Sequence, residues 1–254
     1  MNIGNLLSQI IKGNNVYVNS NKGELMKNQY VGDIGDYGKY GLLRYLSLNG
    51  VSIGVNWYLT ENDGSTDGKF VSYLKNEKER IYDPIVYDSL KRIAFDKDKT
   101  VLGIENANLF SKVSYYHEIL RQHGRDEWHG KALDALQDMQ LVFCDPDNGP
   151  IGKKKLGRKD SEKYVAPNEM IDYYERGQDV VYYCQKARRT PVQWEVTKNE
   201  MRNYISEAEI IVLTYHRGTQ RSYIFVVHPN RYNVYLSLIK KLLDTSWGDC
   251  FSLE

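Results

Sequence analysis

The chain has 254 residues, with 34 Lys and Arg against 33 Asp and Glu, which gives a formal net charge of +1. This near balance excludes binding of nucleic acid through overall basic charge, so any such binding needs a local basic patch. Charged residues make up 26% and apolar residues 41% of the chain, as is typical of a globular protein with one full core.

The elements predicted from apolar periodicity alternate between helix and strand. In chain order they are a helix at 5–11, a helix at 37–48, a strand at 51–59, a helix at 83–94, a strand at 100–104, helices at 115–122 and 128–138, a strand at 141–144, a helix at 168–175, a strand at 179–184, a helix at 196–205, strands at 209–215 and 222–227, and a helix at 232–243. This alternation predicts an α/β fold, a three-layer sandwich with a central, mainly parallel sheet of Rossmann-like or glycosylase-like type.

The domain organisation and location follow from what interrupts the chain. No repeat or linker divides it, so we expect a single domain over 1–254, with 1–24 peripheral. The three cysteines lie far apart without paired spacing, which favours a reducing cytoplasm. No apolar stretch suits a membrane span or a signal peptide, so we expect no membrane partner. The oligomeric state is left open.

The most informative stretch is the end of the strand at 141–144. Asp145, Pro146, Asp147, Asn148 and Gly149 follow it directly. In a parallel α/β sheet, side chains just past the carboxyl end of a strand face the ligand crevice. Asp145, Asp147 and Asn148 are therefore candidate catalytic residues, with an Asx-rich turn as the alternative.

A second candidate region is the glycine-rich block at 32–41. Four glycines in ten residues allow close approach of a backbone to a ligand. Asp33, Asp36 and Lys39 follow at three-residue spacing, which can bring them to one face at a helix start. An aspartate in such a position also caps a helix, and that alternative is left open for Asp36.

Two further sites lie late in the chain. His216, Arg217 and Arg221 belong to a loop between two strands that suits phosphate binding, with a solvated hairpin loop as the alternative. His228 and Pro229 follow the strand at 222–227, so His228 is a candidate acid, base or oxyanion stabiliser. No His–carboxylate set has metal-ligand spacing, so we expect no metal.

The two strand-end motifs Cys144-Asp145-Pro146 and Val227-His228-Pro229 resemble the signature motifs of the uracil-DNA-glycosylase superfamily. The resemblance implies that Asp145 or Asn148 acts on water or the sugar cation, and that His228 acts on the leaving base. Asp147 stands where that family has an aromatic residue, and Asn230 where serine is common.

A second resemblance covers more of the chain. The glycine-rich helix at 32–48, the strand at 55–59 and the Asp145-Pro146 tip are similar to those of methyltransferases that modify adenine in ribosomal RNA. The strand at 222–227 falls near their late proline-bearing strand. The chain lacks their glycine-rich adenosylmethionine loop after residue 59 and the aromatic residue after the acid–proline tip. The block at 32–44 also resembles uncharacterised bacterial proteins.

The first functional hypothesis is a DNA glycosylase that needs no cofactor and excises a flipped, modified base. A role in defence against foreign DNA with such bases is one extension of it. The alternatives are an adenosylmethionine-dependent nucleic-acid methyltransferase and a non-enzymatic nucleic-acid binder. The residues expected to line the pocket are Asp33, Asp36, Asp145, Asp147, Asn148 and His228, with Tyr37, Tyr40 and Trp57 for stacking on the base and Lys39, His216, Arg217 and Arg221 for binding the substrate.

Overall fold

A computed structural model describes residues 31–61, 70–95, 99–121, 123–152 and 160–254. The predicted helix at 5–11, the peripheral segment 1–24 and the basic loop at 153–159 lie outside these residues. So do positions 62–69, which follow the first strand.

The fold is α/β, with a seven-stranded mixed sheet in the order β2-β1-β3-β4-β6-β5-β7. The strands are β1 (Ile53–Asn56), β2 (Val113–Tyr116), β3 (Leu141–Cys144), β4 (Asp179–Gln185), β5 (Glu209–Tyr215), β6 (Arg221–Val227) and β7 (Phe251–Leu253). The pairings among β2, β1, β3 and β4 are parallel, whereas those from β4 through β6 and β5 to β7 are antiparallel. The sheet is thus parallel at one end only, which is less than the mainly parallel sheet that we expected.

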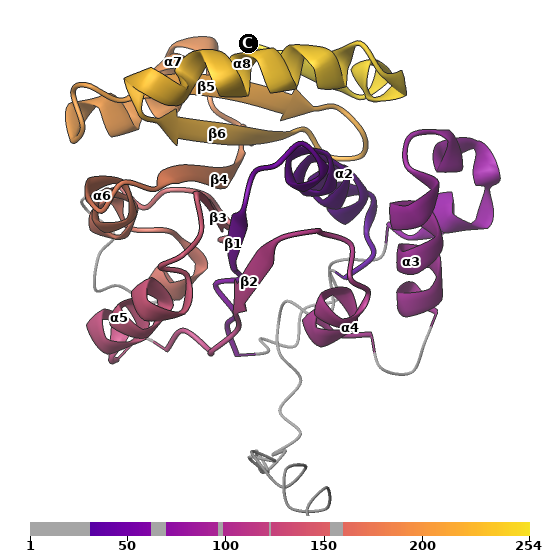
Figure 1. The fold of residues 1–254 in the computed structure, drawn as a ribbon, viewed down its shortest axis with the longest axis horizontal. Helices are drawn as coiled ribbons and strands as arrows, with labels where there is room; N and C mark the ends of the chain where they lie inside the picture. Colours follow the sequence, from indigo (N-terminus) through magenta and orange to yellow (C-terminus); the bar gives the residue numbers. More distant parts are fainter. Residues whose placement is uncertain (1–30, 62–69, 96–98, 122, 153–159) are drawn as a thin grey trace, which may run out of the picture.

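Helices pack on both faces of this sheet (Figure 1). One face carries α2 (Ile34–Leu48), α3 (Pro84–Ala94), α4 (Val101–Asn106) and α8 (Pro229–Leu243), whose apolar side chains form one core cluster with the strands. The other carries α5 (Arg125–Ala135), α6 (Pro167–Glu175) and α7 (Pro191–Lys198), which form a second cluster. Short 3₁₀ helices lie at Ser72–Lys75, Glu77–Ile81, Ser161–Lys163, Glu200–Asn203 and Ser246–Asp249.

Three predicted elements are wrong, each for a local reason. The stretch predicted as a strand at 100–104 begins α4, because the hydroxyl of Thr100 accepts a hydrogen bond from the amide of Gly103 and caps a helix. Part of the helix predicted at 115–122 is β2, whose Val-Ser-Tyr-Tyr sequence suits a strand beside β1. The predicted helix at 196–205 begins earlier, at Pro191 after the Thr190 cap, and ends at Lys198.

The direction in which the strands run decides at which end of the sheet a site can form. β1 lies between β2 and β3 in the sheet. The next strand of the chain, β2, is therefore added on one side of β1, and β3 is added on the other side. Ligands of open α/β sheets bind at such a switch point, outside the carboxyl ends of the strands. Here the first residues past those ends are Trp57 after β1 and Asp145 after β3, and the amide of Asp145 donates to the carbonyl of Asn56 at 3.0 Å.

Among the described residues, no helix has the length and apolarity that crossing a membrane requires.

Candidate functional site

A cavity of about 360 Å³ opens at this switch point, at the lower end of the size range of ligand pockets. Its walls come from the start of α2, the residues after β1 and β3, and the facing ends of β4 and β6. The lining residues are Val31, Asp33, Gly35, Asp36, Lys39, Tyr40, Trp57, Val101, Asp145, Pro146, Asp147, Asn148, Lys163, Tyr183, Gln185, Arg221 and Tyr223.

The centre of the cavity wall is a buried ion cluster. The ammonium of Lys39 lies 2.9 Å from Oδ2 of Asp145 and 2.7 Å from Oδ1 of Asp36. Burial lowers the pKa of Lys39, but the attraction of Asp145 and Asp36 outweighs it and raises that pKa well above its ordinary value. Burial also raises the pKa of Asp36, with Lys39 opposing the shift. Lys39 therefore stays protonated at neutral pH and acts as a fixed cation rather than as a base.

The start of α2 supplies Asp36 to this cluster and Asp33 beside it. Asp33 is the N-cap of the helix, and its carboxylate accepts from the amide of Asp36 at 2.9 Å. Asp36 in turn accepts from the amide of Gly32 at 3.0 Å. Asp33 also accepts from Nη2 of Arg221 at 2.9 Å, which ties α2 to β6. Capping and lining the cavity are therefore compatible roles for both aspartates.

The helix glycines have a different role from the one that we expected. A Cβ on Gly35, Gly38 or Gly41 would lie less than 3 Å from the side chains of Arg221, Tyr215 and Trp247, respectively. The space beside Gly38 and Gly41 is thus occupied by aromatic rings of the protein itself. Gly38 lets α2 pack closely on β5, and Gly41 lets it pack on the 3₁₀ helix Ser246–Asp249, so the close approach at both is to protein rather than to a ligand.

The aromatic residues Tyr40 and Trp57 both line the cavity. The ammonium of Lys39 lies 5.1 Å from the ring centroid of Tyr40 and 5.6 Å from that of Trp57. Tyr37, which we expected to stack on a base, does not line the cavity. It is fully buried, and its hydroxyl donates to the carbonyl of Glu79 at 2.7 Å.

His228 lies at the opposite edge of the sheet from Asp145. β6 runs antiparallel to β4, so its end pairs with the start of that strand, and Nδ1 of His228 lies 2.9 Å from Oδ1 of Asp179. The expectation that His228 shares a pocket with Asp145 is therefore wrong. The sequence carried the relevant signal, because five residues between β5 and β6 suffice for a hairpin but not for a parallel crossover.

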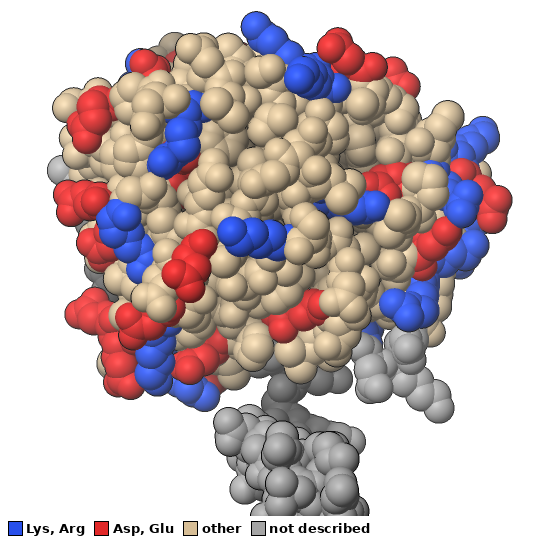
Figure 2. All heavy atoms as spheres, in the orientation of Figure 1, with Lys and Arg blue, Asp and Glu red and all other residues tan. Residues whose placement is uncertain are grey.

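Of the expected phosphate-binding residues His216, Arg217 and Arg221, only Arg221, the first residue of β6, lines the cavity. Nε2 of His216 lies 2.7 Å from the hydroxyl of Ser252, and Arg217 pairs with Glu79. His216 and Arg217 are thus held by contacts within the protein. In Figure 2, acidic and basic side chains are interspersed over the face that is shown, without a broad basic area there.

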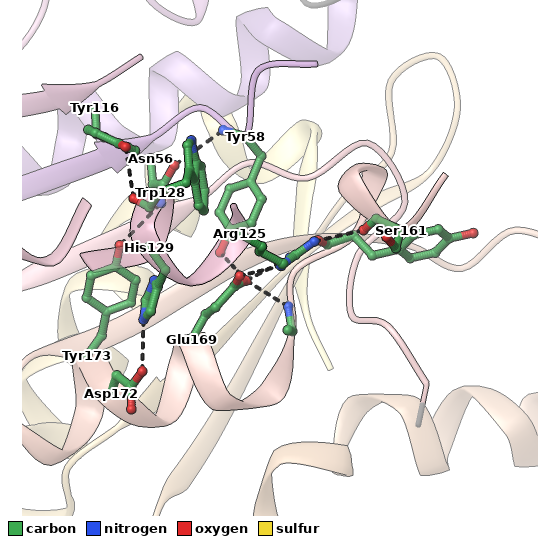
Figure 3. A network of polar contacts seen from close by, with 12 residues as sticks. Asn56, Tyr58, Tyr116, Arg125, Trp128, His129, Ser161, Glu169, Asp172 and Tyr173 are labelled. Atoms are coloured by element: carbon green, nitrogen blue, oxygen red, sulfur yellow. Dashed lines mark hydrogen bonds and ion pairs between the residues drawn. The ribbon is translucent and has the colours of Figure 1, made fainter. Parts of the chain in front are cut away.

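A second polar network connects Tyr58, Arg125 and Glu169 (Figure 3). At its centre the buried carboxylate of Glu169 pairs with Arg125, with Nε 2.6 Å from Oε1. Glu169 also accepts from the hydroxyl of Tyr58 at 2.9 Å, next to Trp57 in the chain. Tyr58 has a φ of 48°, a left-handed conformation that costs a non-glycine residue free energy and so needs such support.

Arg125 connects the same network to the loop after β3. Its guanidinium donates to the carbonyls of Ser161 at 3.0 Å and Tyr164 at 2.7 Å. This segment carries Lys163, whose carbonyl accepts from the amide of Asn148 at 3.0 Å. The Glu169–Arg125 pair thereby links the Trp57 wall to the wall formed by Asn148 and Lys163.

Sequence reasoning missed Lys163, Tyr183, Gln185 and Tyr223 as lining residues. Lys163 ends the short 3₁₀ helix Ser161–Lys163, a segment without a recognisable motif. The others are tyrosines and a glutamine at strand ends, and their positions become informative only once β4 and β6 are known to be antiparallel neighbours. No group of three or more His, Cys, Asp or Glu side chains among the described residues is arranged to hold a metal ion.

Comparisons with known proteins add little to this picture. No family model matches the chain, and no curated protein does. A similar solved structure is that of protein LPL1258 from Legionella pneumophila str. Philadelphia 1, described by the family model DUF519. It is 13% identical, the match covers 89% of this chain and 95% of that chain, and the TM-score is 0.44. At this level of similarity we draw no conclusion from it.

Proposed function

We propose that this protein is an enzyme that transfers a methyl group to a nucleobase of nucleic acid, with the cavity at the β1–β3 switch point as its active site. The observation that carries the proposal is that Lys39 of α2, Trp57 after β1 and Asp145 after β3 line one cavity. These three segments are the ones that resemble the adenine methyltransferases of ribosomal RNA. The glycosylase resemblance requires Asp145 and His228 together, and they lie at opposite edges of the sheet.

A methyltransferase of this kind implies adenosylmethionine as methyl donor, which departs from our first expectation of an enzyme without a cofactor. The lining residues suit a cation, because four acids (Asp33, Asp36, Asp145 and Asp147) outnumber three bases (Lys39, Lys163 and Arg221). The rings of Tyr40 and Trp57 add the aromatic faces that favour cationic groups. When bound, the donor supplies an electrophilic methyl group, and Asp33, Asp36, Tyr40 and Trp57 are the residues that would hold it.

The residues of the chain would act on the base. Asp145 is 3% exposed and follows a fully buried strand, so its position is fixed. Its carboxylate, which pairs with Lys39, would accept a hydrogen bond from an amino group of the base and orient the nitrogen lone pair. Asn148 would add a second hydrogen-bonding group on the same side of the cavity.

The burial of the cavity wall limits the form of the substrate. Lys39, Trp57 and Asp145 are at most 9% exposed, so a base inside a duplex would not reach them. We therefore propose a substrate whose base is unpaired or flipped out of the stack, in DNA or RNA.

With helices on both faces of the sheet, we also propose a three-layer arrangement of Rossmann-like type for the domain.

Base excision is the second candidate function, and one observation favours it. Asp145, Asp147 and Asn148 all line the cavity, which is the set expected to activate water or stabilise a sugar cation in a glycosylase.

The experiment that tests the proposal incubates the full chain with adenosylmethionine labelled in the methyl group and with separate pools of ribosomal RNA, transfer RNA and DNA. We expect label in the nucleic acid and, after digestion, a methylated nucleoside. Alkali-labile abasic sites that form without adenosylmethionine would instead establish base excision. If neither product forms in any pool, the proposed function is wrong.

A further inference from the structure

One polar group in the cavity wall is unused by the fold. Tyr223 of β6 is fully buried and lines the cavity, and its hydroxyl has no hydrogen-bond partner among the described residues. Its ring packs against Phe143, Tyr183 and Phe251, with centroids 6.2, 6.4 and 6.3 Å away. The ring is therefore fixed by packing, whereas the hydroxyl contributes nothing to it.

A hydroxyl in this state destabilises the folded protein. Buried polar groups are nearly always hydrogen-bonded, because burial removes their bonds to water. Phenylalanine would keep every ring contact of Tyr223 and avoid that cost. Because Tyr223 lines the cavity, a ligand that enters there could give this hydroxyl the partner that the described residues do not.

The surroundings of Tyr223 define the chemistry of that partner. Burial is the largest effect and raises the pKa of the phenol, Lys39 and Arg221 oppose the shift, and Asp145 adds to it, so the hydroxyl keeps its proton. It is thus a hydrogen-bond donor, with two cations and one carboxylate acting on it. Such a corner of the cavity favours an electron-rich acceptor over an amino group.

We infer that the hydroxyl of Tyr223 donates a hydrogen bond to an acceptor of the bound nucleobase, a carbonyl oxygen or a ring nitrogen. Tyr223 is then a specificity-determining residue, on a different wall of the cavity from Asp145, which accepts. A base that offers both an amino group and a neighbouring acceptor would satisfy both residues. The inference rests on the proposed function only in taking a nucleobase as the ligand.

Tyr215 provides a matched control. It lies on the neighbouring strand β5, two residues beyond Leu213, which pairs with Tyr223, and it pairs with Arg221. Its hydroxyl is also buried and finds no partner in the part of the chain that the structure describes, but Tyr215 packs against Gly38 and is not among the residues that line the cavity. Removing the hydroxyl from either tyrosine therefore makes the same chemical change inside or outside the site.

The test compares wild type, Tyr223→Phe and Tyr215→Phe by thermal unfolding and calorimetry with AMP, CMP, GMP, UMP and adenosylmethionine as probes. Without a probe, both variants should unfold at the wild-type temperature or above it. At least one nucleotide should stabilise the wild type. Tyr223→Phe should bind that nucleotide about tenfold more weakly, the scale of one hydrogen bond, and Tyr215→Phe should bind it as the wild type does.

Three results would overturn the inference: a lower unfolding temperature of Tyr223→Phe without a probe, equal binding by wild type and Tyr223→Phe, or no nucleotide bound by the wild type. The methyl-transfer assay separates this from the proposed function. Binding that depends on Tyr223 in a protein without methyl transfer supports the inference and contradicts the function. Methyl transfer with unchanged nucleotide binding in Tyr223→Phe does the reverse.

Discussion

The ammonium of Lys39 lies 2.9 Å from Oδ2 of Asp145, a residue 106 positions further along the chain. The pair joins the first described helix to the carboxyl end of a central strand, and it does so in the wall of the cavity. Because Asp36 binds the same ammonium at 2.7 Å, Lys39 remains partnered when Asp145 loses its charge. This arrangement allows the charge of Asp145 to be removed without unfolding the chain.

Asp145→Asn keeps the size and hydrogen-bonding shape of the side chain but removes its charge. We expect a folded protein with methyl transfer reduced by roughly two or more orders of magnitude, the scale of one electrostatic or acid–base group. Initial rates with the best nucleic-acid pool measure the effect. His228→Ala is the comparison, because His228 lies at the other edge of the sheet, and it should keep its activity per folded molecule. Equal losses in both variants would contradict the position of the site.

Glu169→Gln tests the polar network of Arg125 and Glu169. The change leaves Arg125 without its buried charge partner, and we expect the free energy of unfolding to fall by about 2 to 4 kcal/mol. Urea denaturation measures it. Glu209→Gln is the control, because Glu209 pairs with Arg202 with both side chains more than 40% exposed, and it should cost less than about 1 kcal/mol. Similar losses in the two variants would show that the network does not stabilise the fold.

Gly38→Ala tests the packing role of the helix glycines. Its Cβ would lie 2.6 Å from the ring of Tyr215, which is fully buried, so we expect a destabilisation of about 1 to 3 kcal/mol by overpacking. Gly130→Ala in α5 is the matched control, since no atom lies within 4 Å of its Cβ. That variant should gain up to about 1 kcal/mol from helix propensity. If Gly38→Ala is as stable as the wild type, the tight contact is absent in solution.

Asp36 makes the stability depend on pH. Because its pKa is raised in the folded protein, the folded chain holds this proton at pH values where the unfolded chain has lost it. The contribution of Asp36 is therefore fully present below its unfolded pKa and is lost as the pH rises through the folded pKa. Urea denaturation between pH 4 and 7 should show the wild type losing stability relative to Asp36→Asn as the pH rises. The opposite trend would mean that Lys39 lowers the pKa of Asp36 below its ordinary value.

The α/β class was predictable because strands such as β3 and β5 are short apolar runs between helical patterns. The acids at the end of β3 were predictable as well, since an apolar run that stops at Asp145-Pro146 has a limited set of structures. A polar residue followed by proline comes directly after both β3 and β6, however. It marks opposite edges of the sheet because β6 runs in the other direction.

Other features depend on contacts that sequence patterns do not encode. The glycines of α2 indicated close approach, but the partners of Gly38 and Gly41, Tyr215 and Trp247, lie far along the chain. The end of strand β2 was included in the helix predicted at 115–122, because the four residues of β2 are too few to show a clear alternation. Pairing with β1, which the sequence pattern does not encode, completes the strand.

The ion pair of Asp33 with Arg221 spans 188 positions of the chain. Together with the Lys39–Asp145 pair, it closes the cavity with contacts of high sequence separation, whose loop-closure entropy must be overcome before they form. The cavity walls therefore come into register only when β3, β6 and α2 are all in place. Gain of ligand binding during refolding should coincide with completion of the whole sheet, and a chain cut anywhere between these segments would lose the site as a unit.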